Sequence, residues 1–328
     1  MSPTLPSDTT PGSGPIDITR SAPELYSVRF AGLGRTPGQR DNVQVSANNA
    51  TSPVICKPNV WDASAVDLRV TVSCFSPDGT PIDSRYTILV AGAWAFGRTA
   101  SRGFALSFAD SGAIALDSSA TARNSTGRPG YVGRVAEGSF SVRFQGLEAA
   151  WAAGPVAVAI SPVGQGPKRC RLIAVDPSMA SLGVNRTRPG GGPGDSPFSV
   201  LWLQHGRPSM RFGFAWAQNA GVMADYTPDP AYLINSSGGS VKARKTGPGH
   251  YRVVFAGLGR PANATEIVLV SPFLFSDRIC DITSWGSTGA SDLFVDVACF
   301  DPSSTPVDTR FSVLVTQQAA GSPCFATL

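Results

Sequence analysis

The sequence predicts an all-β protein made of two to three tandem β-sandwich units of about 112 residues, immunoglobulin-like or jelly-roll-like. Three observations support this prediction. The segment CFSPDGTPIDSRYTILV, which begins at Cys74, is nearly repeated from Cys299 as CFDPSSTPVDTRFSVLV. Short runs rich in β-branched and aromatic residues alternate with turn residues. The chain also contains 35 Gly and 27 Pro among its 328 residues, which disfavours long helices.

An early strand and the closing strand of each unit appear when the chain is aligned with itself. The early strand reads YSVRFAGLG from Tyr26, FSVRFQGL from Phe140 and YRVVFAGLG from Tyr251, and the Gly after it indicates a tight turn. The closing strand recurs three times, as YTILV from Tyr86, FSVLW from Phe198 and FSVLV from Phe311. The middle copy is the most divergent of the three.

These recurrences divide the chain into a leader and three units. We expect a flexible leader over 1–23, a shortened first unit over 24–92, a divergent second unit over 93–205, a third unit over 206–318 and a tail over 319–328. The segments GFAL at Gly103 and GFAW at Gly213 have no counterpart inside the first unit. Two explanations stay open. Either the first unit is truncated, or the boundaries are permuted and the N-terminal strand completes another unit.

The segment DLRVTVSC shows the alternation of a half-buried strand. Leu68, Val70, Val72 and Cys74 fall on one face, with polar residues on the other. Its copy keeps the apolar line as Leu293, Val295, Val297 and Cys299. Half-buried antiparallel strands are therefore expected in both units.

The cysteines give the most specific chemical signal. Cys56 and Cys74 are 18 residues apart, and Cys280 and Cys299 are 19 apart at equivalent places in another copy. A pair that recurs as a pair indicates a disulfide in each unit, which persists in oxidising compartments. Cys170 has no partner in the middle copy, so it is either a free buried thiol or bonded to Cys324. With no CxxC and only two His, we expect no metal site.

Two sets of residues are candidate binding positions. Trp61 and Trp285 each follow a paired Cys by five residues, so they either stack on a sugar ring or, as is commoner in sandwiches, lie buried against the disulfide. The PxDxR segments place Asp83 near Arg85 and Asp308 near Arg310. Residues i and i+2 of a strand share a face, where an ion pair could form. These pairs are either a repeated polar binding spot or a structural device that fixes the turn before the last strand.

No signature of an enzyme or a cofactor is present. A serine triad would need a His near a nucleophile, and no GxSxG elbow occurs. The run GGGPG at 190–194 lacks the GK[ST] ending of a phosphate loop. The net charge is only +4 and the Arg residues are scattered, so no nucleic-acid partner is expected. No run of about 20 apolar residues predicts a membrane span.

A group of segments carries a resemblance to known proteins. GFAWAQ, YTPDPAYLINSSGG, GPGHYRVVFAGLG, ICDITSW and VACFDPSSTPVDTRFSVLV resemble the tandem β repeats of uncharacterised secreted proteins of actinobacteria and myxobacteria. The resemblance is best over 212–316, good over 26–90 and poor over 93–205. It implies an exported, repeat-built β protein and brings no catalytic residues with it.

The leading hypothesis is a non-enzymatic extracellular protein that binds a surface or a glycan through the loops between strands. The chain itself shows no signal peptide, because its first residues are polar. One alternative is a structural subunit of an appendage, coat or spore surface, which would self-associate through strand edges. Another is a hydrolase that uses acids of the divergent middle unit, Asp176 and Asp195.

Overall fold

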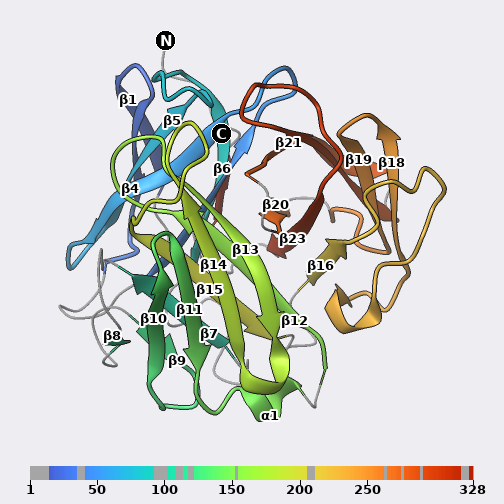
Figure 1. Ribbon diagram of the computed structural model, residues 1–328, viewed down its shortest axis with the longest axis horizontal. Coiled ribbons are helices and arrows are strands. Elements are labelled where there is room, and N and C mark those ends of the chain that lie inside the picture. Colours follow the sequence, from blue (N-terminus) through green and yellow to red (C-terminus); the bar gives the residue numbers. More distant parts are fainter. Residues whose placement is uncertain are drawn as a thin grey trace.

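The chain folds into three β-sandwiches arranged around a common centre (Figure 1). The computed structural model describes residues 15–34, 41–91, 102–107, 114–116, 122–151, 154–204, 211–261, 264–274, 277–288, 291–318 and 325–327. Within these ranges the only helical segments are α1 (Glu148–Trp151) and the 3-10 turns η1 (Pro177–Met179) and η2 (Pro230–Tyr232). The all-β sandwich prediction is confirmed.

The first unit packs an outer sheet, in the order β1-β2-β5-β4, on an inner layer of β3, β6 and β24. Leu68, Val70, Val72 and Cys74 of β5 are fully buried in its core, as the alternation predicts. Its strands are β1 (Ile16–Ala22), β2 (Leu25–Phe30), β3 (Asn42–Asn48), β4 (Ile55–Ala63), β5 (Leu68–Phe75) and β6 (Arg85–Ala91).

The second and third units repeat this plan. In the second, β10, β11, β14 and β13 face β12 and β15, and in the third, β18, β19, β22 and β21 face β16, β23 and β20. The second unit comprises β7 (Arg102–Ser107), β8 (Ile114–Leu116), β9 (Ala122–Asn124), β10 (Gly130–Ala136), β11 (Ser139–Phe144), β12 (Val156–Pro162), β13 (Arg169–Asp176), β14 (Ser181–Thr187) and β15 (Phe198–Gln204). The third comprises β16 (Arg211–Ala217), β17 (Leu233–Asn235), β18 (Val241–Gly247), β19 (His250–Ala256), β20 (Thr265–Phe273), β21 (Ile279–Thr288), β22 (Asp292–Phe300) and β23 (Arg310–Gln318).

The last strand, β24 (Phe325–Thr327), belongs to the first unit. It pairs antiparallel with β6, with Phe325 opposite Leu89. In the third unit Phe214 stands opposite Leu314, and in the second Phe104 stands opposite Leu201. The expected tail therefore supplies the strand that corresponds to GFAL and GFAW. Of the two explanations for the short first unit, permutation agrees with this pairing, but the completing strand comes from the C-terminal segment.

Each unit is joined to the next by the same backbone contact. The residue two places after the aligned cysteine accepts a hydrogen bond from the neighbouring unit at two of the seams: Gly164 N–H donates to Pro58 O at 3.1 Å, and Leu274 N–H donates to Leu172 O at 2.9 Å. At the third seam Ile282 of β21 pairs with Asn48 of β3. The three seams close a ring with pseudo-threefold symmetry.

Three equivalent serines link the inner strands around the axis of this ring. The Ser46 hydroxyl is bonded to both backbone groups of Val270, at 3.0 and 3.2 Å. The Ser161 hydroxyl makes the same two bonds with Val45, at 2.9 and 3.2 Å. Ser271 accepts from Ile160 N–H at 3.5 Å, which completes the circle. A fourth hydrophobic core, made of the inner sheets' rear faces, fills the centre.

Among the described residues, no helix has the length and apolar character that crossing a lipid bilayer requires.

Candidate functional site

The outer face of the first unit carries a row of charges that runs straight across its four strands. Asp17 of β1 is paired in register with Arg29 of β2, Arg29 with Arg69 of β5, and Arg69 with Asp62 of β4. Side chains in register on one face of a sheet are close neighbours. Two arginines therefore stand side by side in the middle of the row, with one carboxylate at each end.

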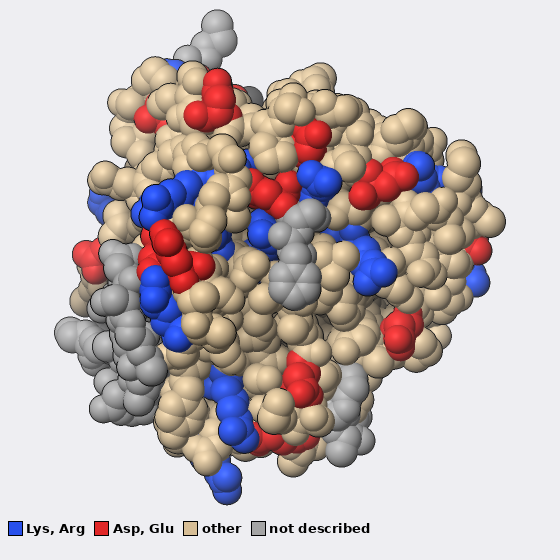
Figure 2. All heavy atoms as spheres, viewed as in Figure 1, with Lys and Arg blue, Asp and Glu red and all other residues tan. Residues whose placement is uncertain are grey.

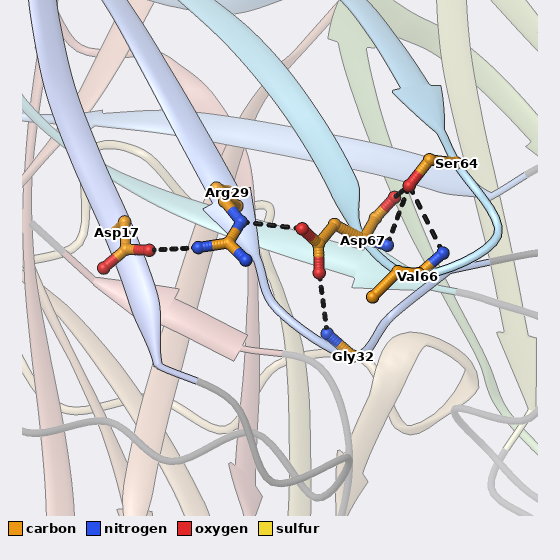
Figure 3. A network of polar contacts seen from close by, with 6 residues as sticks. All are labelled: Asp17, Arg29, Gly32, Ser64, Val66 and Asp67. Carbon is orange, nitrogen blue, oxygen red and sulfur yellow. Dashed lines mark hydrogen bonds and ion pairs between the residues drawn. The ribbon is translucent and has the colours of Figure 1, made fainter.

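The Arg29 guanidinium is held on two sides (Figure 3). Its Nε donates to Asp67 Oδ2 at 2.7 Å and its Nη1 donates to Asp17 Oδ2 at 2.9 Å. Asp67 also accepts the Gly32 backbone N–H at 3.1 Å. The hydrogen bond from Arg29 and that from Gly32 lower the pKa of Asp67, and Asp67 in turn raises the pKa of Arg29. The guanidinium is thus fixed in place and charged.

An open groove of about 540 Å³ runs over this row, lined by β1, β2 and β5. Arg29 and Arg69 form its cationic part, and Asp17, Thr19 and Ser27 add acceptors and hydroxyls. Arg69 is exposed, and no hydrogen bond or ion pair holds its side chain among the described residues. The groove combines one preorganised guanidinium with one that is available to a ligand. Planar guanidinium groups bind carboxylates and sulfates in a bidentate manner.

The matching face of the third unit has a different lining. Its groove, of about 210 Å³, lies over β18, β19 and β22. Arg252 makes two bonds to Asp296, at 2.7 and 2.8 Å, and its guanidinium carbon lies 4.7 Å from the centre of the Phe294 ring. Arg244 stands opposite Arg252, lines the same groove and lies 3.6 Å from Asp225, so both arginines of this groove have carboxylate partners.

The second unit has neither arrangement. Tyr131 stands at the place of Asp17, and it is 41 % exposed. Arg143 stands at the place of Arg29 and contacts Glu148 of α1 at 3.3 Å. Its outer row therefore lacks the neighbouring arginines of the first unit.

The structure contains both expected disulfides, Cys56–Cys74 and Cys280–Cys299. Each joins directly opposed residues of adjacent strands. Cys170 is a free, buried thiol, and burial raises its pKa to about 12. Its suggested partner Cys324 lies outside the described residues. The residue opposite Cys170 is Arg186, a replacement that sequence reasoning did not identify.

The two aligned tryptophans pack inward to different degrees. Trp61 is 9 % exposed, lies in the core of the first unit and donates its indole N–H to Asp41 O at 3.1 Å. Trp285 is half-buried and packs against the core of the third unit. The structure therefore gives Trp61 a packing role and leaves only part of Trp285 accessible.

The aspartates of the PxDxR segments fasten a hairpin in each unit. Asp83 accepts two bonds from Arg20, at 2.7 and 2.8 Å, together with the Glu24 N–H and the Tyr26 hydroxyl. These bonds, with that from Arg20 the largest influence, lower the pKa of Asp83 to about 2.

The third unit repeats this arrangement. Asp308 contacts Lys245, the Gly249 N–H and the Tyr251 hydroxyl. Arg85 and Arg310, the suggested partners of the two aspartates, are exposed and lie outside these contacts.

The two acids proposed for a hydrolase are also held by local contacts. Asp176 caps the turn η1 by accepting the Ser178 and Met179 N–H groups. Asp195 accepts the Gly138 N–H at 2.8 Å and pairs with Arg134 at 2.8 Å. Within the described ranges, no group of three or more His, Cys, Asp or Glu side chains is placed to hold a metal ion.

No family model, no curated protein and no solved structure matches this chain. The suggested resemblance to secreted tandem β repeats therefore stays a prediction. A proposal for the function of this protein has to rest on the geometry of the chain itself.

Proposed function

We propose that this protein is a non-enzymatic extracellular binding protein that recognises an acidic glycan in the groove of its first unit. The observation that carries the proposal is the direct cross-strand pairing of Arg29 with Arg69. Like charges directly opposite each other destabilise a sheet. An anionic ligand that bridges the two guanidinium groups would remove this cost.

The remaining groove residues suit a saccharide. Asp17, Thr19 and Ser27 line the same groove and offer acceptors and donors to sugar hydroxyl groups. A volume of about 540 Å³ is in the range of small-molecule sites, and its open shape suits a chain that continues at both ends. The two disulfides agree with an oxidising, extracellular setting.

Binding to a set of polysaccharides tests the proposal. Heparin, polygalacturonate and hyaluronan would be compared with neutral dextran by titration calorimetry at two salt concentrations. We expect binding to at least one acidic polymer, weakened by salt, because exposed charges are screened. Arg69→Ala should weaken it about tenfold, the value of one charge-assisted hydrogen bond.

Arg85→Ala is the matched control, since Arg85 is an exposed arginine of the same unit outside the groove. It should leave the affinity unchanged. Equal losses in the two variants would indicate attraction by net charge alone and would contradict a defined site. A chain that binds none of the polymers but assembles with rising concentration would support a structural subunit instead.

A further inference from the structure

A small cavity lies where the three units meet. Its volume is about 60 Å³. All three aligned cysteines, Cys56, Cys170 and Cys280, line it, and so do the aligned residues Val45, Ile160 and Val270 of the inner strands. Because each unit contributes the same positions, the cavity lies on the pseudo-threefold axis. Figure 2 shows basic and acidic side chains gathered near the middle of the face on which the units converge.

The lining includes a buried arginine whose hydrogen-bonding capacity is only partly used. Arg169 is 6 % exposed, and its Nη2 contacts Asp277 Oδ2 at 2.8 Å and Arg188 O at 3.2 Å. Its Nε and Nη1 have no hydrogen-bond partner among the described residues. Buried donors are nearly always paired, and leaving them unpaired destabilises the folded state. A partner inside the cavity would satisfy them.

The charge around the cavity is positive. Asp277 is shared, since Arg171 lies 3.4 Å from its other oxygen, and Arg278 also lines the cavity. Asp281 is the one carboxyl group of the described lining, and it accepts the Val54 N–H at 2.7 Å. Burial raises the pKa of Asp281 well above its usual range, which favours the protonated form of this carboxyl, a hydrogen-bond donor.

We infer that the axial cavity binds a small anion, either a halide or a carboxylate of the size of formate, held by the Arg169 guanidinium. The volume admits a few water molecules or one such ion, and excludes a sugar. The ion would occupy the junction of all three units, so its binding would stabilise the ring as a whole. The site is separate from the glycan groove.

Crystals of the whole chain soaked in sodium bromide test the inference directly. The expected result is an anomalous peak in the axial cavity within hydrogen-bonding distance of Arg169. A cavity that contains only water after the soak, in a protein whose stability does not depend on the anion, would overturn the inference.

Thermal unfolding supplies the second measurement and distinguishes the two kinds of ion. The unfolding midpoint would be measured in chloride, in formate and in gluconate, which is too large to enter, at equal ionic strength. A bound anion should raise it by about 2–4 °C over gluconate, and the more effective salt identifies the ion.

Arg169→Met should abolish this difference, whereas Arg85→Met and the groove variant Arg69→Ala should keep it. An anion effect that persists in Arg169→Met would contradict the assignment. If Arg169→Met does not fold, the bromide soak and the anion dependence of the unchanged chain decide the question. Because Arg69→Ala separates the two sites, failure here leaves the glycan proposal standing.

Discussion

Arg186 lies directly opposite Cys170, at the position that Cys74 and Cys299 occupy opposite their partners in the other units. Its guanidinium carbon is 3.3 Å from the centre of the Phe140 ring, and Nη2 lies 3.5 Å from Asp195. Phe140 in turn stands where the other units have Tyr26 and Tyr251. A stacked arginine thus replaces both a disulfide and a tyrosine hydroxyl that contacts the hairpin aspartate.

Introducing the cysteine and the tyrosine of the other units into the second unit should therefore allow a disulfide to form there. The double variant Arg186→Cys with Phe140→Tyr is expected to fold and to form a third disulfide with Cys170. The hydroxyl group introduced at position 140 would reach Asp195, as the Tyr26 hydroxyl reaches Asp83 at 2.9 Å. Thiol titration of the unfolded protein and mass mapping would check this. Cys170 still reactive as a thiol in a folded double variant would contradict the equivalence of the positions.

The hairpin turn predicts opposite outcomes for two substitutions. Glu24, Gly138 and Gly249 hold the same place, with φ of 64°, 68° and 66°. A side chain in this left-handed region costs about 1–2 kcal/mol. Glu24→Gly should therefore stabilise the protein by about 0.5–1 kcal/mol in urea unfolding. Gly249→Ala should destabilise it, because a Cβ there would lie 2.6 Å from Cys299 O. The same sign for both variants would show that backbone strain does not govern this turn.

Because of Lys57, the free energy of unfolding should rise as the pH is raised above 7. The lysine is fully buried at the seam between the first and second units, and its ammonium donates to Gln165 O at 3.3 Å. Burial lowers its pKa from 10.5 to about 7. Between these values the unfolded chain binds the proton more than the folded chain does, so stability rises with pH.

The measurement is the free energy of unfolding at pH 7 and at pH 9. The unchanged protein should gain about 2 kcal/mol more than Lys57→Met, which has no group to titrate. Lys242→Met, which removes an exposed lysine, is the control and should behave as the unchanged protein does. Parallel pH profiles of the unchanged chain and Lys57→Met would show that the Lys57 ammonium is solvated in the folded state.

Strand β24 should stabilise the first unit, and a separate peptide of the same sequence should be able to replace it. Deleting residues 319–328 removes the partner of β6 and leaves the backbone of that strand unpaired at a sheet edge. We expect a lower unfolding temperature and concentration-dependent association, as exposed edges pair with other chains. A synthetic peptide of residues 319–328 should reverse both effects, and a scrambled peptide should not. A truncated chain that stays monomeric with an unchanged midpoint would contradict this role.

The sequence predicts the repeat, the strands and two disulfides because these depend on local patterns that each copy spells out. Cys56 and Cys74 could be paired from their recurrence alone. The place of β24 could not, since the pairing of Phe325 with Leu89 joins segments far apart in the chain, and the short match of CFAT to GFAW and GFAL is too weak to align.

The groove of the first unit was missed for a related reason. Arg29, Arg69 and Asp17 lie in three separate strands, and only the register between strands places them side by side. The candidates Asp83 and Asp308 stood out because they repeat. Repetition in this chain marks the contacts that hold every unit together, such as the hairpin aspartates. The positions of Arg29 and Arg69, in contrast, hold Arg143 and Ser181 in the second unit and Val254 and Phe294 in the third.

The three serines bond around the axis in one direction. In each unit the serine side chain contacts the backbone of one neighbouring unit, and the backbone is contacted by the serine of the other. A substitution at Ser46, Ser161 or Ser271 is therefore felt on both sides of the seam it crosses, and all three units retain the residue. The outward rows differ among the units, with Asp17, Tyr131 and Lys242 at one shared position. Because three copies are fused in one chain, the outer face of each unit can change independently of the other two. The inner contacts, in contrast, have to remain equivalent, as they would in a symmetric trimer.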